Sequence, residues 1–147
     1  MRFRAQILHL DMAGRVFHRI GRRGGFLLLL AIIDIGYGAS LIGPSAEAVN
    51  LSTTIWRETY APLWVWGAGW LVVAAVLIVT AFLRDDMIGY SAAIGWKLLW
   101  GLTTLASWLF GGVARGWVST IIWSVVAGMV AVVAGWPEPT RPQPEEP

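Results

Sequence analysis

The chain has 147 residues, of which 56% are hydrophobic and 14% are charged, and its mean hydropathy is +0.63. An ordinary soluble domain is less apolar, so this composition indicates a membrane protein with room for one membrane domain. Cysteine is absent, which excludes disulfides, thiolate metal ligands and a cysteine nucleophile. The net charge is only +2, but six of the eleven basic residues lie in the first 23 positions.

Residues 1–23 have the pattern of a basic amphipathic helix that lies on the membrane surface. One predicted face carries Arg4, Asp11, Arg15, His18 and Arg22, and the other carries Phe3, Leu10, Phe17 and Ile20. Such a helix binds anionic lipid on the cytoplasmic leaflet through its arginines, which here are Arg4, Arg15, Arg19, Arg22 and Arg23. We expect a topology anchor, and a regulatory or partner-binding arm is the alternative.

Four segments are long and apolar enough to cross a bilayer core, which needs roughly 20 helical residues. They are residues 24–42, 63–83, 88–110 and 117–136. Short turns separate the last three, so these helices are expected to be antiparallel neighbours. The sequence thus predicts an all-α integral membrane protein with four transmembrane helices in an antiparallel bundle. Residues 137–147 are rich in proline and glutamate, and we expect a disordered tail there.

Basic residues near the span ends predict the orientation, because they are retained on the cytoplasmic side. The N-terminal flank has six, whereas the loop 43–62 has only Arg57 and the turn 111–116 has only Arg115. Both termini are therefore expected in the cytoplasm, with the chain in the cytoplasmic (inner) membrane. Boundary tryptophans fit this topology, with Trp56, Trp64, Trp108 and Trp117 outside and Trp136 inside, while the deeper ones are expected to pack within the bundle: Trp70, Trp96, Trp100 and Trp123.

A cleavable secretory signal is a competing interpretation of the N-terminus. Basic residues, an apolar run and the segment Ala46-Glu47-Ala48 imitate one, and Arg22-Arg23 resembles part of a twin-arginine signal. The region before the apolar run is long and Asp34 interrupts the run, so we expect the first span to be retained. Cleavage would leave three spans and would remove Asp34.

Two ionisable residues stand alone in the predicted spans, Asp34 in the first and Lys97 in the third. Both spans run from the inside outward, and both residues lie about 14–15 Å along them at 1.5 Å per residue. An ion pair between the first and third spans is the simplest way to hold both charges in hydrocarbon. The alternatives are that Asp34 or Lys97 lines a polar pathway or titrates during gating, or that each faces its own aqueous or intersubunit contact.

Small residues recur on faces of the predicted spans and predict close helix packing. This packing stripe comprises Gly38, Gly101, Thr104, Thr120, Ser124, Gly128 and Gly135. Such stripes pack helices within a bundle and also allow self-association, so a homo-oligomer is one expected partner state.

Signatures of enzymes and of nucleic-acid binding are missing from the sequence. It has no HExxH helix, no glycine-rich phosphate loop and no Gly-x-Ser-x-Gly. His9 and His18 project to opposite faces of the predicted helix and cannot jointly bind a metal. We therefore expect a non-enzymatic protein without a cofactor, a metal or a nucleic-acid partner.

Three apolar segments resemble those of small four-span membrane proteins of actinobacterial viruses and their hosts' genomes. They are RRGGFLLLLAIIDIGYGASL, PLWVWGAGW and KLLWGLTTLASWLFGGVARGWVSTIIW, and the resemblance covers about residues 22–136. Some proteins of this group are treated as holin-like, meaning that they assemble in the host membrane and help to release the lysis enzyme. The resemblance implies a membrane location and self-association that permeabilises the cytoplasmic membrane during lysis.

Two other functions fit the same features. A structural or stabilising subunit of a larger membrane complex would need a membrane-protein partner and no chemistry of its own. A small transporter or channel would need a polar cavity and usually internal repeats or broken helices. The short likeness between GYGASL and GYSAAI is too brief to establish a repeat.

Overall fold

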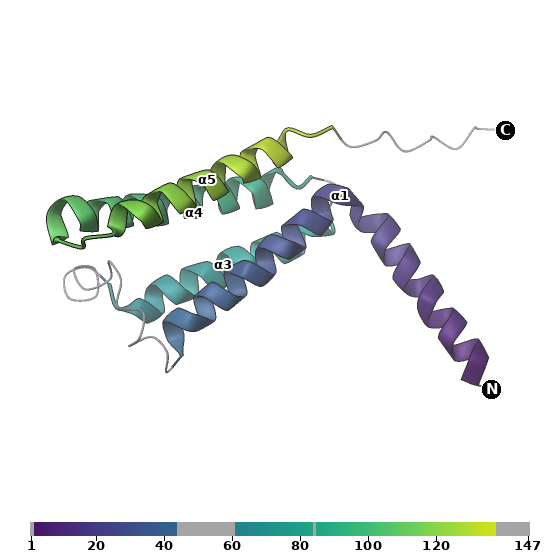
Figure 1. Ribbon diagram of the computed structural model, residues 1–147. Helices are drawn as coiled ribbons and strands as arrows, with labels where there is room; N and C mark the ends of the chain where they lie inside the picture. Colours follow the sequence, from purple (N-terminus) through teal and green to yellow (C-terminus); the bar gives the residue numbers. More distant parts are fainter. Residues whose placement is uncertain (1, 44–60, 84, 138–147) are drawn as a thin grey trace.

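The computed structural model describes residues 2–43, 61–83 and 85–137, and it describes side chains from residue 21 onward. Within these ranges the chain forms four α-helices and no strand: α1 (Arg2–Ile42), α3 (Leu63–Ala81), α4 (Met87–Gly111) and α5 (Gly116–Ala134). Figure 1 shows the last three helices and the second part of α1 running alongside one another as a bundle. The tail predicted to be disordered lies outside the described residues from position 138 onward.

Helix α1 bends at Gly21, and only the part after the bend belongs to the bundle (Figure 1). Gly21 has φ 66° and ψ −179°, a backbone conformation that is open essentially to glycine alone. The sequence predicts the end of the surface helix at residue 23, and the break lies two residues earlier because Gly21 can adopt this conformation. The side chains of Arg4, Arg15 and Arg19 lie outside those described, so their contact with lipid stays a prediction.

The other helix ends follow from local residue chemistry. Pro62 has no N–H to leave unpaired and precedes α3, and the Asp85 carboxylate accepts a hydrogen bond from the Met87 backbone N–H at the start of α4. Gly112 follows α4 with φ 68°, the left-handed conformation that commonly ends a helix. Helices α3 and α5 end two residues before the predicted spans do, at Ala81 and Ala134.

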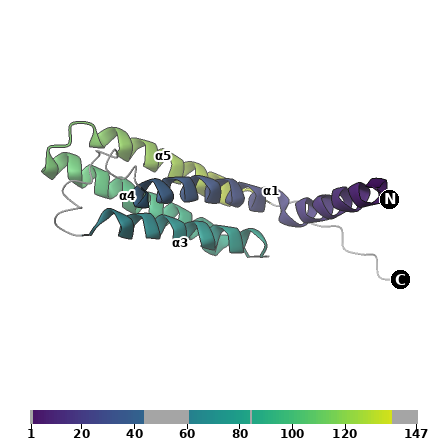
Figure 2. The same ribbon diagram turned by 90° about the horizontal axis from the view of Figure 1, so that it is seen from below.

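The helices form two hairpins, α1 with α3 and α4 with α5, which pack on each other as two layers (Figures 1 and 2). Glycines allow close approach within each hairpin. A Cβ atom on Gly38 would lie 2.9 Å from the Gly67 carbonyl oxygen, and a Cβ atom on Gly116 would lie 2.7 Å from the Thr104 carbonyl oxygen. Any larger residue at these positions would separate the backbones.

Apolar side chains fill the centre of the bundle and also cover much of its outside. Leu27, Leu30, Leu77 and Val130 are buried between the helices. The exposed side chains include many large apolar ones on every helix, among them Ile32, Ile33, Val72, Val79, Leu102, Ile121, Val125 and Val132. Large apolar residues on the outside are unfavourable in water and favourable in lipid.

Three helical segments are long and apolar enough to cross a membrane: Gly21–Ile42, Leu63–Ala81 and Gly116–Ala134. They coincide with the first, second and fourth predicted spans and indicate a membrane protein. The third predicted span corresponds to α4, which is not among the three. At 25 residues α4 is long enough, but Lys97 and several threonine, serine and glycine residues lower its apolar character.

Candidate functional site

Asp34 of α1 and Lys97 of α4 lie in direct contact at the centre of the bundle. The Lys97 Nζ donates hydrogen bonds to both oxygens of the Asp34 carboxylate, at 2.9 and 3.0 Å. Both side chains are fully buried, at 0% exposure. Two-oxygen contact with an ammonium group gives each buried charge its counterion, so the pair enters the apolar interior as a neutral unit.

An aromatic cluster with members on all four helices lies next to the ion pair. The Lys97 Nζ lies over the ring of Trp70, 5.2 Å from its centroid, at a distance typical of a cation–π contact. Ring centroids within the cluster lie 4.6 to 6.2 Å apart, and its members are Tyr37, Trp66, Trp70, Trp96, Trp100 and Trp123. The four tryptophans expected to pack inside the bundle all belong to it.

The interior also holds buried N–H groups that form no hydrogen bond within the described part of the chain. The indole N–H groups of Trp70 and Trp96 are buried and have no hydrogen-bond partner within the described part of the chain. Burying a donor without an acceptor is costly, so these two indole N–H groups are isolated polar atoms in an otherwise apolar interior.

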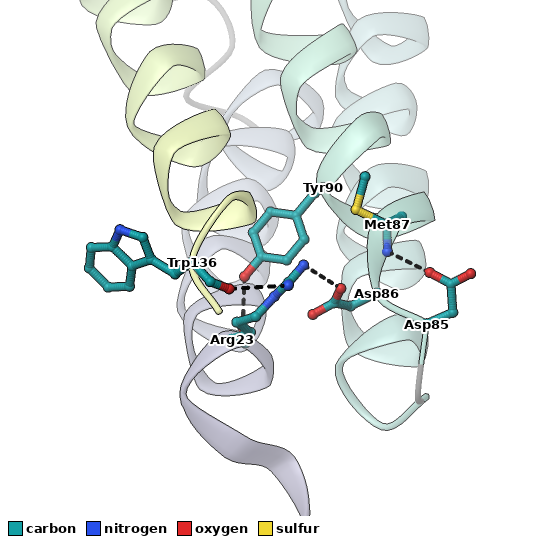
Figure 3. Close-up of polar contacts among 6 residues, drawn as sticks. All are labelled: Arg23, Asp85, Asp86, Met87, Tyr90 and Trp136. Atoms are coloured by element: carbon teal, nitrogen blue, oxygen red, sulfur yellow. Dashed lines mark hydrogen bonds and ion pairs between the residues drawn. The ribbon is translucent and has the colours of Figure 1, made fainter. Parts of the chain in front are cut away.

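Arg23 joins three helices at the end of the bundle where the bend of α1 lies (Figure 3). Its guanidinium forms an ion pair with Asp86 at the start of α4, at 2.6 Å, and donates a longer hydrogen bond of 3.4 Å to the Trp136 carbonyl oxygen after α5. The Tyr90 hydroxyl donates to the Arg23 carbonyl oxygen at 3.2 Å, and the Tyr90 ring lies under the guanidinium, 5.1 Å away. We call this group the Arg23 clasp.

The sequence predicts Arg23 as a membrane-surface residue, and the structure instead turns its side chain toward the bundle at 16% exposure. Arg22 is exposed, and its contact with lipid stays a prediction. The Arg23 clasp is the part of the site that the sequence analysis missed. The Arg23–Asp86 and Asp34–Lys97 pairs share a separation of 63 residues, which points to Arg23 and Asp86 only after the Asp34–Lys97 pair is assumed.

The predicted packing stripe divides into residues that pack within the chain and residues that do not. Gly38 packs against α3, and a Cβ atom on Gly101 would lie 3.7 Å from atoms of Thr120, Trp123 and Ser124 of α5. The hydroxyls of Thr104 and Thr120 share a hydrogen bond of 3.1 Å across α4 and α5.

Gly128 and Gly135 contact no neighbouring helix. A Cβ atom on Gly128 would meet nothing within 4 Å, and one on Gly135 would approach only carbonyl oxygens of its own helix. The C-terminal half of the α5 stripe, which comprises Gly128 and Gly135, therefore faces away from the bundle.

No family model, curated protein or solved structure matches the chain. Among the described residues no group of three histidine, cysteine, aspartate or glutamate side chains could hold a metal ion. What the site offers is two ion pairs that hold α1 against α4, one deep and one at the end of the bundle.

Proposed function

We propose that all four helices of the bundle span the cytoplasmic membrane, with both termini inside, and that α4 is the third span. The 25 residues of α4 extend about 37 Å at 1.5 Å per residue, which exceeds a hydrocarbon core of about 30 Å. Its single charge, Lys97, is fully buried against Asp34. A paired charge turned inward presents no charge to lipid at that depth.

We further propose a holin-like function, in which copies of the chain self-associate in the membrane and permeabilise it. The observation that carries this proposal is the position of the two charges within the predicted spans: Asp34 and Lys97 are buried between the hairpins, and the side chains on the outer faces of the helices are largely apolar. A closed single chain is thus compatible with lipid. An assembly in which the hairpins separate would expose Asp34, Lys97 and the indole N–H groups to a central water-filled path.

A stabilising subunit of a larger membrane complex is the second candidate. The specific observation in its favour is the open C-terminal half of the α5 stripe, where a Cβ atom on Gly128 would have no neighbour within 4 Å. A helix of another membrane protein could approach closely there, because glycine removes the side chain that would hold it off.

Timed expression in bacteria separates these candidates. A holin-like protein produces abrupt loss of membrane potential after a delay, together with release of a cytoplasmic or co-expressed lysis enzyme. A stabilising subunit leaves growth unaffected at the same expression level and co-purifies with one membrane protein. Healthy growth at high expression contradicts the holin-like proposal.

A further inference from the structure

Helices α1 and α4 carry complementary charges at two matching levels. Arg23 and Asp34 are eleven residues apart on α1, and Asp86 and Lys97 are eleven residues apart at the start and middle of α4. Eleven residues are about three helical turns, so the two positions on each helix share a face. The order of signs along the chain is positive then negative on α1, and negative then positive at Asp86 and Lys97.

This charge pattern is satisfied in one register of α1 against α4 and places like charges opposite each other in the alternatives considered next. A parallel register offset of 63 residues satisfies both pairs at once. Sliding one helix by eleven residues brings Asp34 opposite Asp86 or Arg23 opposite Lys97, which are like charges. Two parallel copies of α1 would place Arg23 opposite Arg23 and Asp34 opposite Asp34. Like charges facing one another are a recognised device against wrong pairing.

We infer that this two-level charge pattern also joins different copies of the chain, so that α1 of one copy pairs with α4 of the next. The inference rests on the self-association proposed above. Separating the hairpins of a single chain would leave Asp34 and Lys97 without their counterions. Among surfaces that α1 could then meet, the α4 face of a second copy carries the complementary signs at the required spacing.

The connection between the hairpins is long enough for such an exchange. Residues 82–86 join α3 to α4. Fully extended, five residues span about 17 Å, whereas packed helix axes lie about 8–10 Å apart. A connection of this length allows α4 and α5 of one copy to lie against α1 and α3 of its neighbour, with the Arg23–Asp86 and Asp34–Lys97 pairs reformed between copies. Because α1 of one copy meets α4 of another, the exchange can close reciprocally between two copies or continue head-to-tail around a ring.

Charge reversal tests the exchange by complementation between chains. Asp34→Lys alone leaves two lysines at the deep level, and Lys97→Asp alone leaves two aspartates, so each variant should lose folded protein when expressed alone. Co-expressed with different tags, the two variants should regain folded protein and co-purify, because each supplies the counterion that the other lacks. The matched control is D34K/K97D in one chain, which should fold by itself. Recovery in the double variant without recovery in the mixture overturns the inference.

Cysteine cross-linking tests the exchange with all native charges in place. This experiment remains informative even if the charge-reversal variants do not fold. The chain has no cysteine, and the rings of Phe26 and Tyr90 lie 6.4 Å apart between α1 and α4. Copies tagged differently and carrying Phe26→Cys or Tyr90→Cys should form a mixed cross-linked dimer in membranes with a short thiol cross-linker. Two tagged copies that both carry Phe26→Cys are the control and should cross-link far less.

The outcomes keep the exchange and the proposed function apart. Absence of the mixed dimer in membranes that the wild-type chain permeabilises overturns the exchange and leaves the holin-like function standing. A mixed dimer in membranes that stay sealed supports the exchange and overturns the holin-like function. Equal cross-linking in the Phe26→Cys control shows random collision and also overturns the exchange.

Discussion

Asp34 and Lys97 are tolerated in the apolar interior because each is the counterion of the other. The Lys97 Nζ donates hydrogen bonds to both Asp34 carboxylate oxygens and also lies over the Trp70 ring. The ammonium group therefore contacts a negative charge and the negative face of an aromatic ring. Removing one partner leaves an uncompensated buried charge, whereas removing both leaves an apolar or weakly polar gap. Removing one partner should therefore lower the free energy of unfolding more than removing both.

The first prediction uses this difference. Asp34→Asn and Lys97→Met should each lower the free energy of unfolding by about 3–5 kcal/mol, because each leaves one buried charge unpaired. The double variant should be less destabilised than the sum of the single variants. Unfolding by SDS in mixed micelles measures all four proteins as a double-mutant cycle. Additive losses would show that the contact contributes no coupling energy.

The second prediction concerns the Arg23 clasp. Arg23→Gln should lower the free energy of unfolding by about 1 kcal/mol, since the Arg23–Asp86 pair is only partly shielded from solvent. Arg22→Gln is the matched control on the same turn, and it should have no measurable effect because Arg22 is exposed. Thermal unfolding in detergent compares the two variants. Equal effects would mean that the basic charge matters and the clasp does not.

At the scale of the helices, glycine has opposite roles at neighbouring positions of α1. Gly38 lies where α1 and α3 approach most closely, with the Gly67 carbonyl oxygen and the Trp70 Cβ atom within 3.0 Å of any added Cβ. Gly36 is on the same helix and has nothing within 4 Å. The same substitution therefore removes helix flexibility at both positions and creates crowding at one.

The third prediction follows from this pair of glycines. Gly38→Ala should lower the free energy of unfolding by about 1–3 kcal/mol, because backbone atoms of α3 must move to admit the methyl group. Gly36→Ala should be neutral or should stabilise the helix by up to about 1 kcal/mol. SDS unfolding of the two variants in parallel gives the comparison. A loss at Gly36 as large as that at Gly38 would contradict the close approach of α1 and α3.

The positions of three apolar helices could be predicted from sequence because hydrophobic length is a property of a continuous segment. The Asp34–Lys97 contact could be predicted as well, since two lone charges at equal depth in apolar runs have few other ways to be neutralised. The Arg23 clasp could not be predicted in the same way. Arg23 lies among other arginines at the end of a span, where the positive charge already has an explanation.

Which residues of the packing stripe contact another helix of the chain also depends on tertiary structure. Gly101 and Gly128 both lie in apolar helices with a small hydroxyl residue nearby in sequence, Thr104 three positions after Gly101 and Ser124 four positions before Gly128. Gly101 faces α5, whereas Gly128 faces outward, because the rotation of each helix about its axis is set by long-range packing. Spacing alone identifies a face suitable for packing and does not identify what it packs against.

For the whole molecule, the deciding question is whether α4 crosses the membrane. If it does, the turn after α3 and the turn after α4 lie on opposite sides. If α4 stays on one side, α3 ends and α5 begins on the same side of the membrane. The charge pattern favours crossing, because the Arg23 clasp and the Asp34–Lys97 pair hold α4 parallel to the apolar part of α1.

The fourth prediction tests this topology with single cysteines, which the native chain lacks. Leu83 and Ala114 are exposed residues in the turns before and after α4, so Leu83→Cys and Ala114→Cys should leave the bundle intact. In intact cells, a membrane-impermeant maleimide should label Ala114→Cys and leave Leu83→Cys unlabelled until the membrane is opened. Both variants labelled, or both protected until opening, would place the two turns on one side and would remove α4 from the spans. Labelling of Leu83→Cys alone would keep four spans but put both termini outside, against the distribution of basic residues.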